Sequence, residues 1–317
     1  MLNRQFALLC LVGWLIFVSG GATCMRWPEP AAPQGPRVFL APPSLQEIIA
    51  AVNNNSRRIQ GLQTESATLE VPGQPRLRAS IAIQTPHRFR LKAKVLGPEL
   101  DLGSNDEMFW FWAKRDPNRA VYFGRYANYT FANRPQILPV EPRWLIEAFG
   151  IVFLGEGDFH EGPFPAGADQ VEVRSRLNTN SGPLTRSLVV DAAYGRIMRQ
   201  TLVDQRGQVL ATVTCSEHRY DEVSGATLPH RMGIDLPPAQ LSFRIDVLEY
   251  SINPFYEEDH WATPDEIPGY QWIDLARPGS PPAWFPSPPN SPPDQSSLQG
   301  MRPAFRPVYR GVDTGFR

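Results

Sequence analysis

The chain lacks a dominant charge, a disulfide framework and the short motifs of nucleotide-binding folds. Its 31 basic and 32 acidic residues leave a formal net charge of −1, so composition favours neither a nucleic-acid-binding surface nor an acidic surface for cations. Three cysteines in 317 residues are too few for a disulfide-stabilised scaffold. A glycine-rich phosphate loop and a dinucleotide fingerprint are also missing. We therefore expect no cofactor and no nucleic-acid partner.

The candidate nucleophilic, metal-binding and acidic residues do not form the sequence motifs of a catalytic or metal site. Ser104 does not lie in a Gly-x-Ser-x-Gly elbow between a strand and a helix. The five histidines are scattered, and the nearest grouping places His218 beside Glu217 and Asp221. Neighbours in a strand face opposite sides, so a metal site there is disfavoured. Three acidic residues are interpreted as part of a solvated turn: Asp101, Asp106 and Glu107. The sequence predicts a protein that is not an enzyme and binds no metal.

The first 23 residues have the pattern of a secretory signal peptide. One early cation, Arg4, precedes an apolar run from Phe6 to Val18 and then the small residues 19–23. A run of 13 residues is too short to cross a bilayer as a helix, which takes about 20 residues. Residues 1–23 are therefore predicted to direct export and to be removed.

Cys24 follows directly, where bacterial lipoproteins carry the cysteine that is acylated and becomes the new N-terminus. We expect Cys24 to anchor the chain to a membrane of the bacterial cell envelope, facing the periplasm. The preceding Gly21-Ala22-Thr23 departs from the usual lipobox, and ordinary cleavage after Ala22 is the alternative. Cys215 is in phase with the apolar residues of its strand and is interpreted as a small buried hydrophobe.

Proline marks both ends of the chain. Many of the 33 prolines lie in residues 24–43 and 276–317, where aliphatic residues are few. Such segments cannot bury enough apolar surface to build a core. The first is predicted to be a stiff N-terminal arm, and the second a disordered tail. Residues 44–275 have the length of one all-β domain.

Alternating apolar and polar residues predict a mainly β domain. In 77–83 and 89–95, apolar side chains share one face and polar or cationic side chains the other, as in antiparallel strands with one solvated face. A capping box at Ser44 and Glu47 starts a helix that is expected to end in residues 53–55. Similar short runs bring the predicted strands to about eleven: 62–70, 77–84, 89–95, 108–113, 120–125, 171–177, 184–191, 197–203, 209–216, 231–236 and 241–251.

A second helix is predicted in the middle of the chain, at 142–149, with Pro142 in its first turn and Gly150 at its end. A loop rich in glycine and proline follows from 155 to 167.

The order of these elements resembles the LolA/LolB superfamily of lipoprotein carriers and receptors. The likeness covers roughly residues 44–260 and rests on strand signatures, among them Leu96-Gly97-Pro98, Asp101–Asp106 and Leu188–Asp191. It implies a half-open antiparallel β-barrel whose concave face holds acyl chains under a lid, here the middle helix. It also implies a receptor-type member with its own lipid cysteine and a protruding loop in which Leu96 contacts membrane lipid. The proline-rich tail and the 155–167 loop depart from the family.

The aromatic strand at 108–113 suggests where a ligand is held. Phe109 and Phe111 face one side, and Trp110 and Trp112 the other, so both sides need cover or line a cavity. We expect five residues to border one apolar space between the concave face and the middle helix: Phe89, Leu91, Phe109, Phe111 and Trp144. Trp110 and Trp112 are the alternates for the inward face. A filled core between sheet and helix is the competing interpretation.

Two functions follow from these features. The first is a non-enzymatic envelope lipoprotein that binds lipid or lipoprotein acyl chains in a half-barrel cavity, for lipid or lipoprotein trafficking. The second is an envelope adaptor whose barrel is a filled scaffold and whose proline-rich tail binds partners. An apolar cavity of several hundred cubic ångströms would favour the first, since ligand pockets typically measure about 300–1,000 Å³.

Overall fold

The computed structural model describes residues 34–129, 141–179, 182–264 and 267–277. The predicted signal peptide, Cys24 and all but the first two residues of the proline-rich tail lie outside these residues. Within the described ranges, no helix has the length and apolar character needed to cross a membrane.

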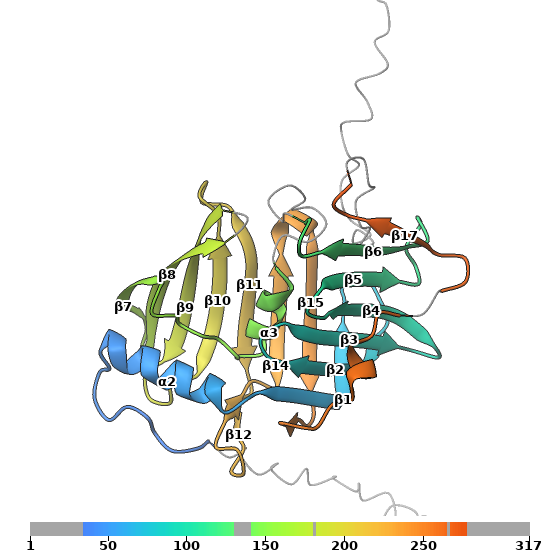
Figure 1. The fold of residues 1–317 in the computed structure, drawn as a ribbon. Coiled ribbons are helices and arrows are strands. Elements are labelled where there is room, and N and C mark those ends of the chain that lie inside the picture. The colour runs from blue at the N-terminus through green and yellow to red at the C-terminus, as the bar shows by residue number, and fades with distance from the viewer. Residues whose placement is uncertain (1–33, 130–140, 180–181, 265–266, 278–317) are drawn as a thin grey trace, which may run out of the picture. The chain divides into compact units, whose positions relative to one another are not determined.

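Fifteen strands form one open, curved sheet (Figure 1), and each half of it can be followed along the chain. The first half consists of β1 (Gly61–Glu70), β2 (Leu77–Gln84), β3 (Arg88–Lys94), β4 (Pro98–Ser104), β5 (Met108–Ala113) and β6 (Ala120–Arg125). The second consists of β7 (Phe159–Gly167), β8 (Gln170–Thr179), β9 (Gly182–Asp191), β10 (Ile197–Val203), β11 (Val209–Ser216), β14 (Arg231–Leu236) and β15 (Leu241–Val247).

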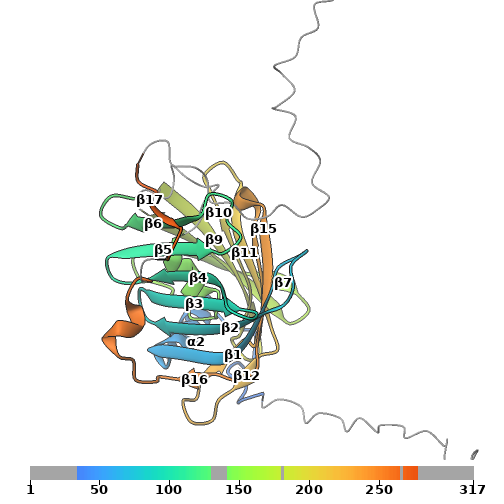
Figure 2. The same cartoon turned by 90° about the vertical axis from the view of Figure 1, so that its right-hand side faces the viewer.

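The two halves join where β1 pairs with β15, and all neighbours in both halves are antiparallel. β16 (Ser251–Ile252) pairs with β1, and β17 (Gln271–Asp274) adds a parallel edge strand beside β6 (Figure 2). β12 (Arg219–Tyr220) and β13 (Thr227–Leu228) form a separate hairpin. The described edge strands β7 and β17 do not pair with each other, so the sheet stays open. The predicted fold class, a mainly β, half-open antiparallel barrel, is confirmed.

The helices are α2 (Leu45–Arg57) and α3 (Pro142–Glu147), with short 3-10 turns η2 (Pro237–Ala239) and η3 (Glu258–Trp261). The capping box is confirmed: the Ser44 hydroxyl accepts from Glu47 N–H, and the Glu47 carboxylate accepts from Ser44 N–H at 2.8 Å. The predicted end of this helix at residues 53–55 is wrong. The Asn53 and Asn55 side chains bond to the backbone of Leu154 and Thr227, so they do not compete with the helix's own hydrogen bonds.

Two segments expected to be loops or turns are strands. β7 contains Pro163 and Pro165, which an edge strand tolerates because its outer side needs no hydrogen-bond donors. β4 contains Gly103, a residue type that is common in turns. In this strand a glycine is needed for packing, because a Cβ on Gly103 would lie 2.2 Å from the Trp110 ring on the neighbouring strand. The glycine therefore allows Trp110 to lie flat against β4.

Both helices cover the same face of the sheet, which we call the concave face. Ile48 and Val52 of α2 pack on Val173, Leu188 and other apolar residues of β8–β10. α3 lies between the two halves and contributes Trp144 to a core shared by β1–β3, β11, β14 and β15. The described end of the N-terminal arm is attached to the domain, since Val38 and Phe39 donate backbone hydrogen bonds to the Ala193 carbonyl.

Candidate functional site

The aromatic strand β5 is covered on both faces, as its sequence pattern predicts. Phe109 and Phe111 face the concave side, and Phe111 lies opposite Leu102 of β4. Trp110 and Trp112 face the convex side, where Trp112 lies edge-on to the Tyr270 ring at 5.5 Å. Phe109 and Phe111 are therefore the inward pair, and the alternates Trp110 and Trp112 are not.

The convex side holds a buried polar network. The Trp110 Nε1–H donates to Asp101 Oδ1 at 3.1 Å, and Arg90 Nη2 forms an ion pair with Asp101 Oδ2 at 2.8 Å. Arg90 also donates to the carbonyls of His260 and Ala262. The interpretation of Asp101 as part of a solvated turn is therefore wrong, because β4 carries it under the C-terminal segment. This network pairs the buried charges of Arg90 and Asp101 within the protein.

An apolar pocket of about 160 Å³ opens on the concave face. The first half of the sheet supplies Leu69, Leu77, Leu91, Leu100 and Leu102 along with the two phenylalanines of β5. The second half supplies Leu236, Leu241 and Phe243, and Leu145 of α3 lies between the halves. The pocket is therefore built from residues far apart in sequence that the curvature of one sheet brings together.

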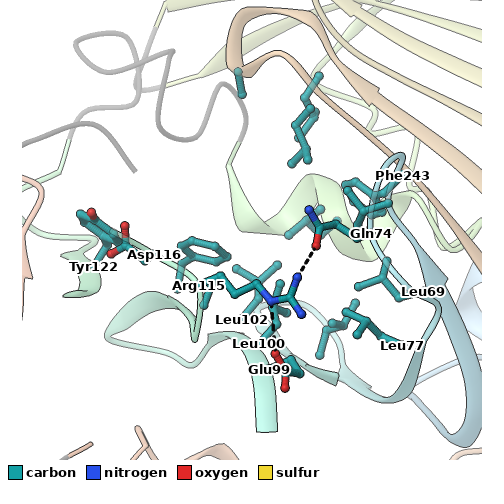
Figure 3. A pocket seen from close by; sticks show the side chains of 18 of the residues that line it. Leu69, Gln74, Leu77, Glu99, Leu100, Leu102, Arg115, Asp116, Tyr122 and Phe243 are labelled. Carbon is teal, nitrogen blue, oxygen red and sulfur yellow. Dashed lines mark hydrogen bonds and ion pairs between the residues drawn. The ribbon is translucent and has the colours of Figure 1, made fainter. Parts of the chain in front are cut away.

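Polar groups gather at one side of the pocket (Figure 3). Arg115 reaches from the β5–β6 turn to Gln74 in the β1–β2 turn, donating from Nη1 to Oε1 at 2.9 Å. Its Nε lies 4.0 Å from Glu99 Oε2, a weak ion pair. The pair Arg115–Gln74 joins two turns across the rim, so we call it the rim clasp.

Deeper polar groups at the pocket are held by the protein. Asp116 accepts from the backbone N–H of Ala120 at 3.0 Å and of Asn118 at 3.2 Å. The Tyr122 hydroxyl accepts from Asn118, and burial raises the pKa of Tyr122 to about 12. These groups fix the β5–β6 turn, and they leave the remaining lining apolar.

The five residues expected to border one space are divided between two environments. Leu91, Phe109 and Phe111 line the pocket. Phe89 lies in the packed core with its ring 6.3 Å from that of Phe149, and Trp144 is buried in the same cluster. Period-two patterning assigns a residue to a face of the sheet but not to a position along it, and these two positions lie where α3 fills the space.

The middle helix is held firmly in that core. Glu147 Oε2 accepts from Gln200 Nε2 at 2.8 Å and forms an ion pair with Arg186 at 3.3 Å. The Arg186 side chain is only 2% exposed and also donates to the Phe153 carbonyl. These contacts tie α3 to β9 and β10. The helix expected as a lid thus covers part of the concave face and is itself largely buried there.

The sequence pattern does not reveal several pocket residues. Leu100 and Leu102 lie in a segment that the sequence predicts to be a loop and a turn, although they alternate with Glu99 and Asp101 as strand residues do. Leu241 and Phe243 alternate in the same way on β15. Their alternation was visible, but the proximity of β15 to β4 and β5 depends on the curl of the whole sheet.

The remaining candidate groups lie away from the pocket lining. Cys215 is buried, as expected, and burial raises the pKa of its thiol to about 12. His218 contacts the Ile197 carbonyl through Nε2 at 2.9 Å, and burial lowers its pKa to about 4. Among the described residues, no three His, Cys, Asp or Glu side chains are grouped to hold a metal ion.

Leu96 lies at the tip of the β3–β4 turn. Its relative exposure is 103%, and the neighbouring Val95 is 46% exposed. A role in membrane contact stays a prediction, but the position of the side chain is compatible with it.

These features define an open, curved antiparallel sheet with an apolar pocket on its concave face. No protein-family model matches the chain, and no curated protein matches it in sequence. Among solved structures, the fold is similar to that of a domain from Vibrio parahaemolyticus described as outer membrane lipoprotein-sorting protein. The identity is 11%, the TM-score is 0.45, and the match covers 67% of this chain and 95% of that one.

Two further structures are similar at the same level. A LolA superfamily protein from Nitrosomonas europaea is 9% identical with a TM-score of 0.44, covering 70% of this chain and 98% of that one. A DUF1329 family protein from Desulfovibrio piger is 10% identical with a TM-score of 0.44, and the match covers 69% of this chain and 97% of that one. At this level of identity, the similarity concerns the arrangement of strands alone.

Proposed function

We propose that this protein is an exported, non-enzymatic lipoprotein of the bacterial cell envelope that binds an acyl chain of a lipid or lipoprotein in its concave pocket. The observation that carries the proposal is the pocket itself, lined by leucines and phenylalanines from both halves of the sheet, with Arg115, Gln74 and Glu99 at its rim. An apolar interior with polar groups at the mouth suits an amphiphile whose chain enters and whose head stays in water.

The size of the pocket limits how much of a chain it holds. Its volume of about 160 Å³ is below that of pockets for drug-sized ligands and close to a cavity of about 150 Å³ that binds benzene. Burying about six methylenes at about 0.8 kcal/mol each contributes about 5 kcal/mol. A long chain therefore extends past the mouth, or widens it by opening the rim clasp.

The adaptor with a filled barrel is the second candidate. The packing of Phe89, Trp144 and Phe149 around α3 favours it, because that part of the concave face has the character of an ordinary core. Its proposed interaction segment, the proline-rich tail, lies outside the described residues.

Filling the pocket tests the lipid-binding proposal. Ala113 follows Phe111 on the inward face of β5 and lines the pocket, so Ala113→Phe places a ring in the void. We expect at least a tenfold loss of affinity for a fluorescent C16 fatty acid, with little change in melting temperature. Ala262→Phe, at an exposed position, is the matched control. Undiminished probe binding by a folded Ala113→Phe protein would contradict the proposal.

The anchor is tested separately. Two acyl chains hold a protein stably on a bilayer, where one chain is marginal. We expect the wild-type chain to partition into detergent and Cys24→Ala to remain in the aqueous phase or unprocessed. Equal aqueous partitioning of both would exclude lipidation and leave the pocket proposal standing.

A further inference from the structure

A second pocket, of about 200 Å³, lies where four segments of the chain meet. These are the described end of the N-terminal arm, the end of α2, the β9–β10 turn and the β12–β13 hairpin (Figure 1). The pocket shares no lining residue with the concave pocket. It is larger than a cavity of about 150 Å³ that binds benzene, so it has room for a small organic molecule. We call it the arm pocket.

The lining of the arm pocket is cationic. Its charged side chains are Arg58, at the end of α2, and Arg196, on the β9–β10 turn, and no Asp or Glu lines it. His218 also lines it, but burial lowers the pKa of His218 to about 4, so this imidazole is neutral near pH 7. The C-terminal end of a helix carries about half a negative charge, which is less than the two positive charges of the guanidinium groups. The pocket therefore attracts anions.

The two guanidinium groups lack a counter-ion. Neither is ion-paired with a carboxylate of the described residues. The nearby Asp191 and Asp221 accept hydrogen bonds from backbone N–H groups of their own turns, at 2.8 and 2.6 Å. Burial lowers the pKa of Arg196, although an arginine stays charged at neutral pH. A partly buried cation without a partner is unfavourable, and an anion in the pocket would offset that cost.

Hydrogen-bond donors remain available on both arginines. Arg58 Nη1 donates to the Gly225 carbonyl, and Arg196 donates from both Nη1 and Nη2 to Gln34. The Nε of Arg196 is buried and has no hydrogen-bond partner in the described part of the chain. Each guanidinium has five N–H groups, so these bonds do not exhaust either one. A ligand in this pocket would therefore be an acceptor of hydrogen bonds.

Tyr220 lies between the parts of the wall that hold the two cations. A Cβ on Gly225 would lie 2.7 Å from Arg58 Nη1 and 3.7 Å from the Tyr220 hydroxyl. A Cβ on Gly35 of the arm would lie 2.8 Å from the Tyr220 ring, and the residue before Gly35 accepts from Arg196. Arg58 and the segment bonded to Arg196 are thus both adjacent to Tyr220, which brings the two cations to one small pocket.

We propose that the arm pocket binds a small molecule through a phosphate monoester group, with Arg58 and Arg196 as its counter-ions. A phosphate monoester carries about −1.5 to −2 charges at pH 7, which matches two guanidinium groups. A planar guanidinium also donates two parallel hydrogen bonds to phosphate oxygens. A carboxylate would balance only one of the two cations. Val38 and Ile197 in the lining provide apolar contact for the organic part of the ligand.

Isothermal titration calorimetry with phenyl phosphate tests the proposal on the full chain. We expect one phenyl phosphate to bind per chain. Benzoate should bind at least threefold more weakly because it has one charge, and benzyl alcohol at least tenfold more weakly because it has none. Equal affinity for phenyl phosphate and benzyl alcohol, or no saturable binding of phenyl phosphate up to about 10 mM, would overturn the proposal. Equal affinity for benzoate would overturn the choice of a phosphate.

A carboxylate introduced into the lining places the ligand on the molecule. Ala51 of α2 lines the arm pocket, and glutamate is a good helix former, so Ala51→Glu should fold. We expect it to lose at least tenfold in affinity for phenyl phosphate. Ala50→Glu adds the same charge at the neighbouring exposed position outside the lining and should retain most of the affinity. Equal losses in the two variants would refute binding in this pocket.

Removing the two cations tests their role as counter-ions. Arg58→Gln/Arg196→Gln should reduce the affinity for phenyl phosphate at least tenfold. Arg57→Gln/Arg199→Gln removes the same charge from exposed positions that do not line the pocket, and it should retain most of the affinity. Undiminished binding by the first double variant would place the phosphate elsewhere.

Fatty-acid binding separates this site from the concave pocket. Ala51→Glu should bind the fluorescent C16 fatty acid as the wild type does, which also shows that the variant is folded. In the wild type, fatty-acid binding without phenyl phosphate binding would overturn the arm pocket alone. Phenyl phosphate binding without fatty-acid binding would overturn the concave pocket alone.

Discussion

The concave face has two neighbouring regions that are both lined by apolar side chains, but one is a filled core and the other is a pocket. Around α3, the side chains of Phe89, Trp144 and Phe149 fill the space between sheet and helix. Toward the β1–β2 and β5–β6 turns, Leu91, Phe111 and other apolar side chains surround a void instead. The difference shows that the reach of α3, rather than the hydrophobicity of the strands, decides where this sheet has a core and where it has a pocket.

The reach of the helix is set by its ends. α3 is six residues long, begins with Pro142, and is followed by Gly150 with φ of +81°. A proline at the first turn and a left-handed glycine after the last turn are common helix limits. Only Leu145 of the helix lines the pocket, and the rest of its apolar side chains turn to the filled region.

The largest effect is expected from breaking the polar contact that fixes α3. Glu147→Ala leaves Arg186 buried without its carboxylate partner, which typically costs about 3–5 kcal/mol. Urea unfolding should report this loss. Glu147→Leu/Arg186→Met removes both charges and should recover most of the stability. A loss below about 1 kcal/mol for Glu147→Ala would mean that α3 is held loosely and the two regions do not differ as described.

A pair of phenylalanine deletions compares the two regions directly. Phe149→Ala removes a ring that is 1% exposed in the filled region and should cost about 3–4 kcal/mol. Phe111→Ala removes a half-buried ring from the pocket wall and should cost about 1 kcal/mol, because part of its surface already faces the void. Chemical denaturation measures both. Equal costs would indicate that the pocket is filled in solution.

Leu91→Arg probes the border between the regions. Leu91 is buried, belongs to the core cluster and also lines the pocket. An arginine in a dry core would prevent folding, whereas a guanidinium that reaches the mouth through the void should cost only about 2 kcal/mol. We expect a folded protein by circular dichroism with at least a tenfold loss of fatty-acid probe binding. A folded variant with normal probe binding would place the ligand elsewhere.

Much of this arrangement is predictable from local sequence, and the remainder depends on distant contacts. Period-two alternation gives the eleven main strands, and the capping box gives the start of α2. The strand β4 is obscured because Pro98 and Gly103 are turn-forming residues, and the need for Gly103 comes from the Trp110 ring on another strand. Likewise, patterning assigns Phe89 and Leu91 to the same face of the sheet. It does not reveal that Phe89 packs in the core around α3 whereas Leu91 lines the pocket.

The smallest effect is expected at the C-terminus, where two truncations test which residues belong to the pocket. Removing residues 278–317 should change the melting temperature by less than about 2 °C, because proline-rich segments with few aliphatic residues bury little. Removing residues 271–317 also deletes β17 and Leu275, which is 2% exposed and lines the pocket. That truncation should lower the melting temperature by several degrees and weaken probe binding. A comparable drop from the shorter truncation would show that the tail packs on the domain, and a loss of probe binding with it would make the tail part of the site.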